Sequence, residues 1–283
     1  MIALLAVCVL GLALAALALA LASQSRQRKA LQLQLDATAI ELQQLQFACS
    51  RLAPAGVVHR LVADGAAPGL QPAPERKVAT ALFSDLVGFT ALSEQLEPAL
   101  LARMLNGYFQ RMSDAVHEHR GHLSTFLGDG ILAYFGAVQP NAWQCDDAVR
   151  AALAMRESLR DYNRELALEG LPQLALGIGI HRGPGLAGLI GSRERMEFGF
   201  VGRTVNVAAR VQSLTRVHQV DILVTEALRA ELDACFELVP MPPATVKGIA
   251  EPLVTYAVRG FRAAGEAAAN AATVASDDRL PAP

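Results

Sequence analysis

The chain begins with an uninterrupted apolar segment. Residues 2–22, IALLAVCVLGLALAALALALA, carry no charged side chain, and about 20 apolar residues in a helix are enough to cross the hydrocarbon core of a membrane. The basic residues Arg26, Arg28 and Lys29 follow at once, and such charges favour the cytoplasmic side. The pattern predicts a transmembrane helix over residues 1–23, which makes the protein a single-pass protein of the cell (inner) membrane with the rest of the chain in the cytoplasm.

A cleaved signal peptide is the alternative to this anchor. The small residues Ala20 and Ala22 fit a cleavage site. However, no Lys or Arg precedes the apolar run, and the run is longer than the apolar core of a typical signal peptide. The anchor is therefore the favoured interpretation.

The segment 24–52 has a heptad pattern. Apolar or small residues recur in alternating steps of four and three, at Leu31, Leu35, Thr38, Leu42, Leu45, Cys49 and Leu52. This spacing is typical of a coiled-coil seam. It predicts a juxtamembrane coiled-coil helix that pairs two copies of the chain, with a solitary amphipathic helix as the alternative.

Composition then separates the rest of the chain into three parts. Residues 53–77 are rich in Ala, Pro and Gly and indicate a linker, and residues 263–283 are mostly Ala with small polar residues and Pro, which is typical of a disordered tail. The block 78–262 between them has the size of one ordinary domain.

Within this block, strand-like and helical periodicities alternate. A buried strand is expected at 78–84, an amphipathic helix from about Leu96 to Val116, a β-hairpin at 122–136 around GlyAspGly, a second helix at 144–168 and a strand at 174–180. The order β-α-β-β-α-β is that of a ferredoxin-like α+β sheet.

Charge and composition narrow the classes of partner. The net charge is −2, the sequence pI is about 6.3, and 5% of the residues are aromatic. A nucleic-acid-binding sheet of this topology needs exposed aromatic and basic residues. We therefore expect no nucleic-acid partner.

Two carboxylates stand at the ends of predicted strands. Asp85 follows the first strand in FSDLVGFT, and Asp129 lies in the turn of the hairpin. Because the first strand of a split βαβ sheet lies next to the hairpin, both carboxylates are expected at one edge. Paired carboxylates need compensating charge, and oxygen ligands suit Mg²⁺ or Mn²⁺. Taken singly, each Asp has a plainer explanation as a helix cap or a turn residue.

A second polar group follows further along the chain. Asn206 and Arg210 are separated by one helical turn in GRTVNVAAR, so they share a helix face. An amide beside a guanidinium suits binding of a ribose and neutralisation of charge at phosphorus, although an exposed polar face is the plainer alternative. Lys247, in ValLysGly, is on its own only a loop lysine.

Together these segments resemble the catalytic domain of class III nucleotidyl cyclases, the adenylate and guanylate cyclases. The resemblance covers about residues 54–260. It rests on FSDLVGFT, FLGDGILAYFG, GIGIHRGPGLAGLIGS, VGRTVNVAARV and VKG, which occur in order and at family-like spacing.

The resemblance implies conversion of a nucleoside triphosphate into a 3′,5′-cyclic monophosphate and pyrophosphate, with two Mg²⁺ or Mn²⁺ ions per site. By position, Asp85, the Leu86 carbonyl and Asp129 match the metal ligands. Asn206 matches the residue that orients the ribose, and Arg210 the residue that stabilises the transition state. Lys247 matches the contact to the terminal phosphates. In this family the site lies between two domains, which implies a homodimer.

The residues at the base-reading positions depart from the family pattern. Thr125 stands where adenylate cyclases usually carry Lys and guanylate cyclases Glu, and Gly199 stands where adenylate cyclases carry Asp or Thr. A hydroxyl donates weakly to adenine N1 but cannot accept as strongly from guanine as a carboxylate does. Glu197 is expected on the same strand face as Gly199. The expectation is ATP as substrate with poor selectivity, and GTP as the alternative.

A different class of function competes with catalysis. Loss of the base-reading side chains favours a domain that binds nucleotide, or only dimerises, without turnover. Retention of the two Asp residues, Asn206, Arg210 and Lys247 favours an enzyme, because each suits a catalytic step better than packing.

Overall fold

The computed structural model describes residues 73–192, 196–249 and 251–262, together with Lys29, Gln32, Leu35 and Thr38. Its elements follow the chain in the order β1 (Glu75–Leu86), α3 (Phe89–Gln95), α4 (Pro98–Glu118), β2 (His122–Leu127), β3 (Gly130–Phe135), α5 (Gln144–Leu168), β4 (Leu176–Gly191), β5 (Met196–Val201), α6 (Arg203–His218), β6 (Ile222–Thr225), α7 (Glu226–Arg229), β7 (Phe236–Pro240) and β8 (Thr255–Phe261). The predictions of a membrane helix at 1–23 and of a tail at 263–283 fall outside these residues. Within them, no helix combines the length and apolar character that crossing a bilayer requires.

The strands form one mixed sheet in the order β2-β3-β1-β4-β6-β8-β7, and β5 pairs with β4. The first strands, β2, β3, β1 and β4, pair antiparallel throughout. With α4 and α5 as the two connecting helices, this is the expected βαββαβ arrangement. The prediction of an α+β fold is confirmed, and β1 lies beside the hairpin strand β3 as expected.

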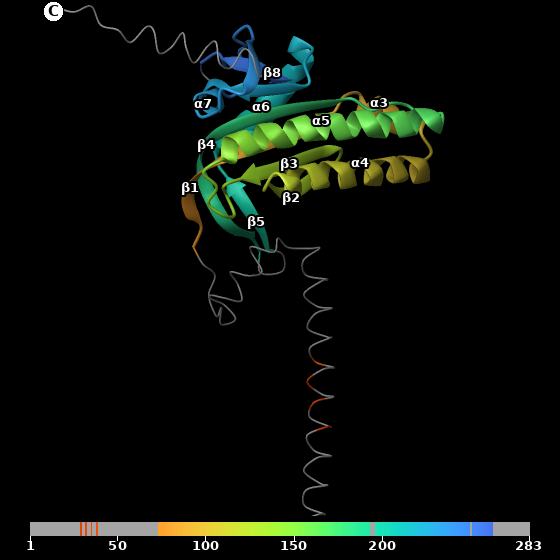
Figure 1. Ribbon diagram of the computed structural model, residues 1–283, viewed down its shortest axis with the longest axis horizontal. Helices are drawn as coiled ribbons and strands as arrows, with labels where there is room; N and C mark the ends of the chain where they lie inside the picture. Colours follow the sequence, from red (N-terminus) through yellow and green to blue (C-terminus); the bar gives the residue numbers. More distant parts are fainter. Residues whose placement is uncertain are drawn as a thin grey trace, which may run out of the picture. The chain divides into compact units, whose positions relative to one another are not determined.

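The two faces of the sheet carry different helices. Leu176, Ile178 and Ile180 on β4 belong to the large core that also contains α4 and α5. Since side chains alternate along a strand, Gly177 and Gly179 point to the opposite face, where they meet α6. Figure 1 shows α4 and α5 side by side, in agreement with their direct contacts.

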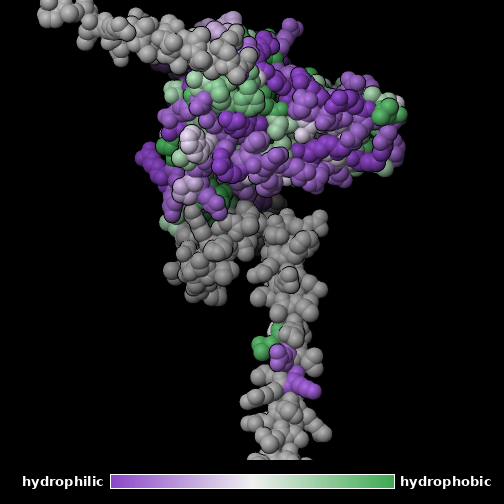
Figure 2. All heavy atoms as spheres, viewed as in Figure 1, coloured by the Kyte–Doolittle hydropathy of each residue, from purple (hydrophilic) through white to green (hydrophobic). Residues whose placement is uncertain are grey.

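The helix pair buries one side only. On α4, Met104, Tyr108, Met112 and Val116 are buried at helical spacing, as the sequence pattern predicted. In Figure 2 the outer surface over the helices is mainly hydrophilic. The main core of the domain therefore lies between this helix pair and the sheet.

The structure corrects several predicted boundaries. β1 begins at Glu75, so the linker predicted for 53–77 ends before that residue. The short helix α3 was not predicted. β4 continues to Gly191, past the GlyProGly sequence at 183–185 that is typical of a turn. At Pro184, β4 pairs with β1 on one side, while pairing with β6 has ended at Ile180 and pairing with β5 begins only at Leu186. The N–H that proline lacks is not needed there.

The approach of α6 to β4 depends on Gly179. A Cβ atom at this position would lie 2.1 Å from the backbone N of Gln212 and 2.5 Å from the carbonyl O of Ala208. Both atoms belong to the α6 backbone, so neither neighbour can move aside alone. The glycine thus sets how close α6 lies to the sheet.

We predict that Gly179→Ala lowers the free energy of unfolding by about 1–3 kcal/mol or more, because overpacking forces backbone shifts. Urea denaturation measures the change. Gly260→Ala on β8 is the matched control, since nothing lies within 4 Å of its added Cβ. Equal stability of the two variants would contradict the role of Gly179.

Candidate active site

Asp85 is the penultimate residue of β1, and its side chain points away from the helix pair. The preceding residue, Ser84, points to the opposite face, where its hydroxyl lies 3.4 Å from the hydroxyl of Tyr108 on α4. Burial raises the pKa of Tyr108, so that hydroxyl stays protonated. Because successive side chains of a strand point to opposite faces, Asp85 lies on the face of the sheet that packs against α6. It is paired in register with Gly177 of β4.

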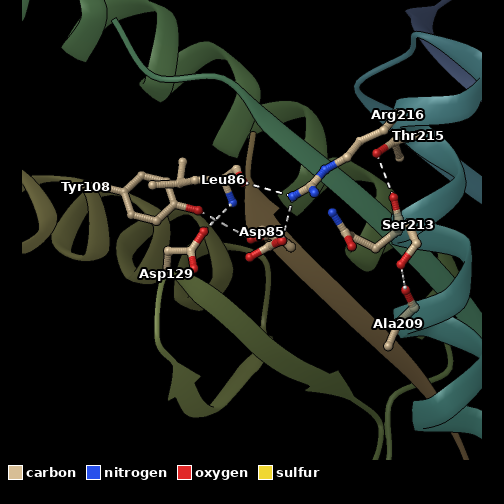
Figure 3. A network of polar contacts seen from close by, with 10 residues as sticks. Asp85, Leu86, Tyr108, Asp129, Ala209, Ser213, Thr215 and Arg216 are labelled. Carbon is tan, nitrogen blue, oxygen red and sulfur yellow. Dashed lines mark hydrogen bonds and ion pairs between the residues drawn. The ribbon is translucent and has the colours of Figure 1, made fainter. Parts of the chain in front are cut away.

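Asp129 reaches the same place from the hairpin. It lies in the turn between β2 and β3, next to Gly128, whose positive φ of 66° glycine adopts without steric cost. The N–H of Leu86 donates a hydrogen bond to Asp129 Oδ2 at 3.2 Å. Figure 3 shows the two carboxylates beside each other at the end of β1. The structure thus brings Asp85 and Asp129 together at one edge, as the sheet topology predicted, and Leu86 lies beside both.

The environment of Asp85 disfavours its charge. Three effects together raise the pKa of Asp85 from 3.8 to about 6: first burial, then repulsion by the neighbouring Asp129 carboxylate, then a hydrogen bond from the protonated Asp85 to Asp129. Arg216 and the Leu86 backbone pull the pKa in the opposite direction without cancelling the effect. Two adjacent carboxylates with incomplete compensation fit a cation site.

Sequence reasoning missed Arg216. Its Nη2 donates to Asp85 Oδ2 at 2.9 Å and to the carbonyl O of Leu86 at 3.1 Å (Figure 3). The only local signal was a basic residue near the C-terminal end of α6, which commonly reflects the helix dipole alone. The contact spans 131 residues of sequence, so no short motif announces it.

Asn206 and Arg210 lie on α6 as predicted, and both are exposed. The described part of the chain gives neither a side-chain hydrogen bond nor an ion pair. At 3.6 residues per turn, Arg210 is rotated by about 120° around the helix from Arg216. Within this one chain, Arg210 therefore does not face the carboxylate pair.

Among the described residues, none of the remaining predicted site residues is hydrogen-bonded or ion-paired to the carboxylates. Lys247 is exposed in the loop between β7 and β8. Thr125 is half-buried on β2, where its hydroxyl donates to the carbonyl of Phe126 at 3.4 Å. Gly199 lies on β5, and the buried side chains of Phe198 and Phe200 place Glu197 and Gly199 on one face, as expected.

The carboxylate pair has the chemistry of a hard-cation site. No cluster of three or more His, Cys, Asp or Glu side chains with metal-site geometry occurs in the described ranges. A pair of carboxylates and a carbonyl nevertheless fits Mg²⁺ or Mn²⁺, which are usually held by one or two carboxylates while waters and substrate phosphates complete the shell. A guanidinium already bonded to two of these oxygens shows that they accept a cation.

We predict that Asp85→Asn stabilises the metal-free protein increasingly as the pH rises. The protonated form of Asp85 favours folding, and this contribution is fully present below pH 3.8 and is lost as the pH rises through about 6. The Asn variant cannot ionise and keeps it. Melting temperatures in EDTA from pH 4 to 7.5 should therefore show a growing advantage of the variant over the unmodified chain.

Asp114→Asn, at an exposed carboxylate on α4, serves as the control. An advantage of Asp85→Asn that stays constant or shrinks over this pH range would contradict the prediction.

Comparison with known proteins places these features in a family. The family model for the adenylate and guanylate cyclase catalytic domain matches residues 71–260. An adenylate cyclase from Anabaena cylindrica is 35% identical over 188 residues, which cover 64% of this chain and 36% of that protein. The chain spans about a third of the length of the curated adenylate cyclases that it matches, with shares of 28% and 36%.

Two solved cyclase structures share this fold and resemble the chain in sequence as well. The adenylyl cyclase CyaB from P. aeruginosa is 29% identical with a TM-score of 0.62, covering 67% of this chain and 97% of that one. The guanylyl cyclase Cya2 is 32% identical with a TM-score of 0.64, covering 68% of this chain and 97% of that one. Because the family model matches most of this chain, the chain belongs to the class III adenylate and guanylate cyclases.

Proposed function

We propose that the chain converts ATP into 3′,5′-cyclic AMP and pyrophosphate at sites formed between two copies of its cyclase domain. The observation that carries the proposal is that Asp85 and Asp129 lie together at the end of β1, with the Leu86 carbonyl beside Asp85, in a member of this family. The matched curated relatives are named adenylate cyclases. ATP is therefore the first substrate to test.

In this proposal the oxygens of Asp85, Leu86 and Asp129 would hold two Mg²⁺ or Mn²⁺ ions. When bound, such ions neutralise the triphosphate and favour deprotonation of the ribose 3′-hydroxyl for in-line attack at the α-phosphorus. Asp85 and Asp129 must both be ionised to bind them. The rigid strand end and the hairpin turn hold the two carboxylates in position before the nucleotide arrives.

The second half of the site comes from a partner copy in this proposal. Arg210 is exposed and rotated away from the carboxylate pair of its own chain, and Asn206 is exposed one turn before it. Both side chains are thus free to meet a nucleotide held by another copy. There Asn206 would orient the ribose, Arg210 would stabilise charge at phosphorus, and Lys247 would contact the terminal phosphates.

The base site supports a preference for ATP with low selectivity. Thr125 offers a hydroxyl, and Gly199 offers only backbone. A site with few fixed polar groups leaves little unpaired when the wrong base binds, so discrimination is weak. Guanylate or dual-specificity cyclase activity is the alternative, and Cya2 is a guanylyl cyclase of similar identity.

We further propose that residues 1–23 anchor the protein in the cell (inner) membrane and that residues 24–52 pair two copies as a coiled coil. Leu35 and Thr38, two positions of the heptad seam, are helical, and Leu35 is 61% exposed in the single chain. An exposed seam leucine supports a partner helix. Pairing by this stalk would raise the effective concentration of the second cyclase domain.

The proposed activity predicts cyclic AMP from the full-length chain supplied with ATP and Mn²⁺ or Mg²⁺, measured by chromatography beside a GTP reaction. Asp129→Ala should abolish the product. Arg210→Ala should lower kcat about 10²- to 10³-fold, the usual loss for a group that stabilises developing charge. Asn206→Ala should lower kcat about 10²-fold, because the ribose would no longer be held in position for attack. No product from either nucleotide would favour a non-catalytic binding or dimerisation module, whereas cyclic GMP as the main product would overturn the ATP preference.

The two-chain site predicts recovery of activity when two inactive variants are mixed. In a dimer of Asp129→Ala with Arg210→Ala, one of the two sites receives an intact Asp pair from one chain and an intact Arg from the other. Random pairing of equal amounts should restore about a quarter of the unmodified activity. A site completed within one chain predicts no recovery, so failure of dimer exchange must be excluded by co-expression.

A further inference from the structure

Arg216 occupies a distinctive place in the candidate metal site. It comes from the last turn of α6, and a single nitrogen, Nη2, is bonded to both the Asp85 carboxylate and the Leu86 carbonyl at 2.9 and 3.1 Å. In Figure 3 the guanidinium points at the end of β1 from the side opposite Tyr108. Those two oxygens belong to the set expected to bind metal.

One cation at these oxygens excludes another. A metal ion bound through Asp85 Oδ2 and the Leu86 carbonyl would need the space directly before these two oxygens, where Nη2 now lies. A guanidinium is always protonated, so it would also repel the ion. The observed position of Arg216 and occupation by metal are therefore alternatives.

Arg216 is held weakly enough to leave. Its side chain is 51% exposed, against 26% for Asp85, so water competes mainly for the guanidinium. An ion pair with a solvent-exposed member contributes little free energy. Its only polar partners in the described residues are Asp85 and Leu86. A divalent ion that gathers both carboxylates gains more than one exposed guanidinium does.

A buried donor without a partner lies next to the same cluster. Gln212, one turn before Arg216, is 4% exposed, and its Nε2 finds no hydrogen-bond partner in the described part of the chain. It lies 3.2 Å from the position of a Cβ on Gly177, the strand partner of Asp85. Buried polar groups are normally satisfied, so the arrangement with Arg216 on Asp85 leaves one donor unused beside the site.

We propose that Arg216 is the resident cation of the Asp85 site in the metal-free protein and that a divalent ion must displace it. Arg216 thus offsets the repulsion between Asp85 and Asp129 until metal arrives, and it sets a threshold for metal binding. This inference rests on the proposed metal site. Nothing in it depends on which nucleotide is the substrate.

The test measures binding of Mn²⁺ alone to the purified full-length chain without nucleotide, by electron paramagnetic resonance of free Mn²⁺. Arg216→Ala should bind Mn²⁺ about two- to fivefold more tightly than the unmodified chain, the factor that corresponds to loss of one exposed ion pair. Asp129→Asn should lose most of the binding in both backgrounds.

Arg229→Ala is the matched control for net charge. Arg229 is 49% exposed and pairs with Glu226 at 2.9 Å, whereas Arg216 is 51% exposed with the same separation from Asp85. The control should leave Mn²⁺ affinity unchanged. An equal gain in Arg229→Ala would overturn the inference, because net charge would then explain the effect.

Melting temperatures distinguish displacement of Arg216 by metal from a purely structural role of Arg216. If Arg216 leaves when metal binds, Arg216→Ala lowers the melting temperature in EDTA and not in saturating Mn²⁺. An equal decrease in both conditions, or equal Mn²⁺ affinity with and without Arg216, would overturn the inference and leave the metal site standing. Absence of Mn²⁺ binding in every protein would overturn both the inference and the proposed metal site.

Discussion

The candidate site is built around the repulsion between two carboxylates, Asp85 on β1 and Asp129 in the adjacent hairpin turn. Asp85 and Asp129 lie next to each other, and the pKa of Asp85 is raised to about 6 by burial and by its neighbour. A protein gains no stability from such a pair without a cation. The position of β1 between β3 and β4, the tight hairpin turn and the close packing of α6 all serve to bring these groups together.

Helix α6 links the two halves of the proposed chemistry. Its packing on Gly179 brings Arg216 to the carboxylates of its own chain, while Asn206 and Arg210 remain exposed. Because these residues share one rigid helix, the distance between α6 and β4 affects both groups together. A homodimer can then use one surface twice, with each copy giving an Asp pair to one site and an Asn/Arg pair to the other.

Much of the fold could be predicted because its signals are local. The periodicity of 144–168 predicted α5 with its observed bounds, and GlyAspGly between two apolar runs predicted the β2-β3 hairpin. The meeting of Asp85 with Asp129 followed from sheet topology alone. The length of β4 could not be predicted, since Pro184 is tolerated only because of its position between two pairing segments. Arg216 was missed because long-range packing, not a motif, selects it from the other cations of the chain.

The most direct test of this account is a crystal structure of the full-length chain with Mn²⁺, with data collected at a wavelength where manganese scatters anomalously. The account predicts an anomalous peak about 2.0–2.2 Å from oxygens of Asp85, Leu86 and Asp129, with the Arg216 guanidinium moved away from Asp85. Arg216 still bonded to Asp85 and Leu86, with no peak between the carboxylates at millimolar Mn²⁺, would contradict it.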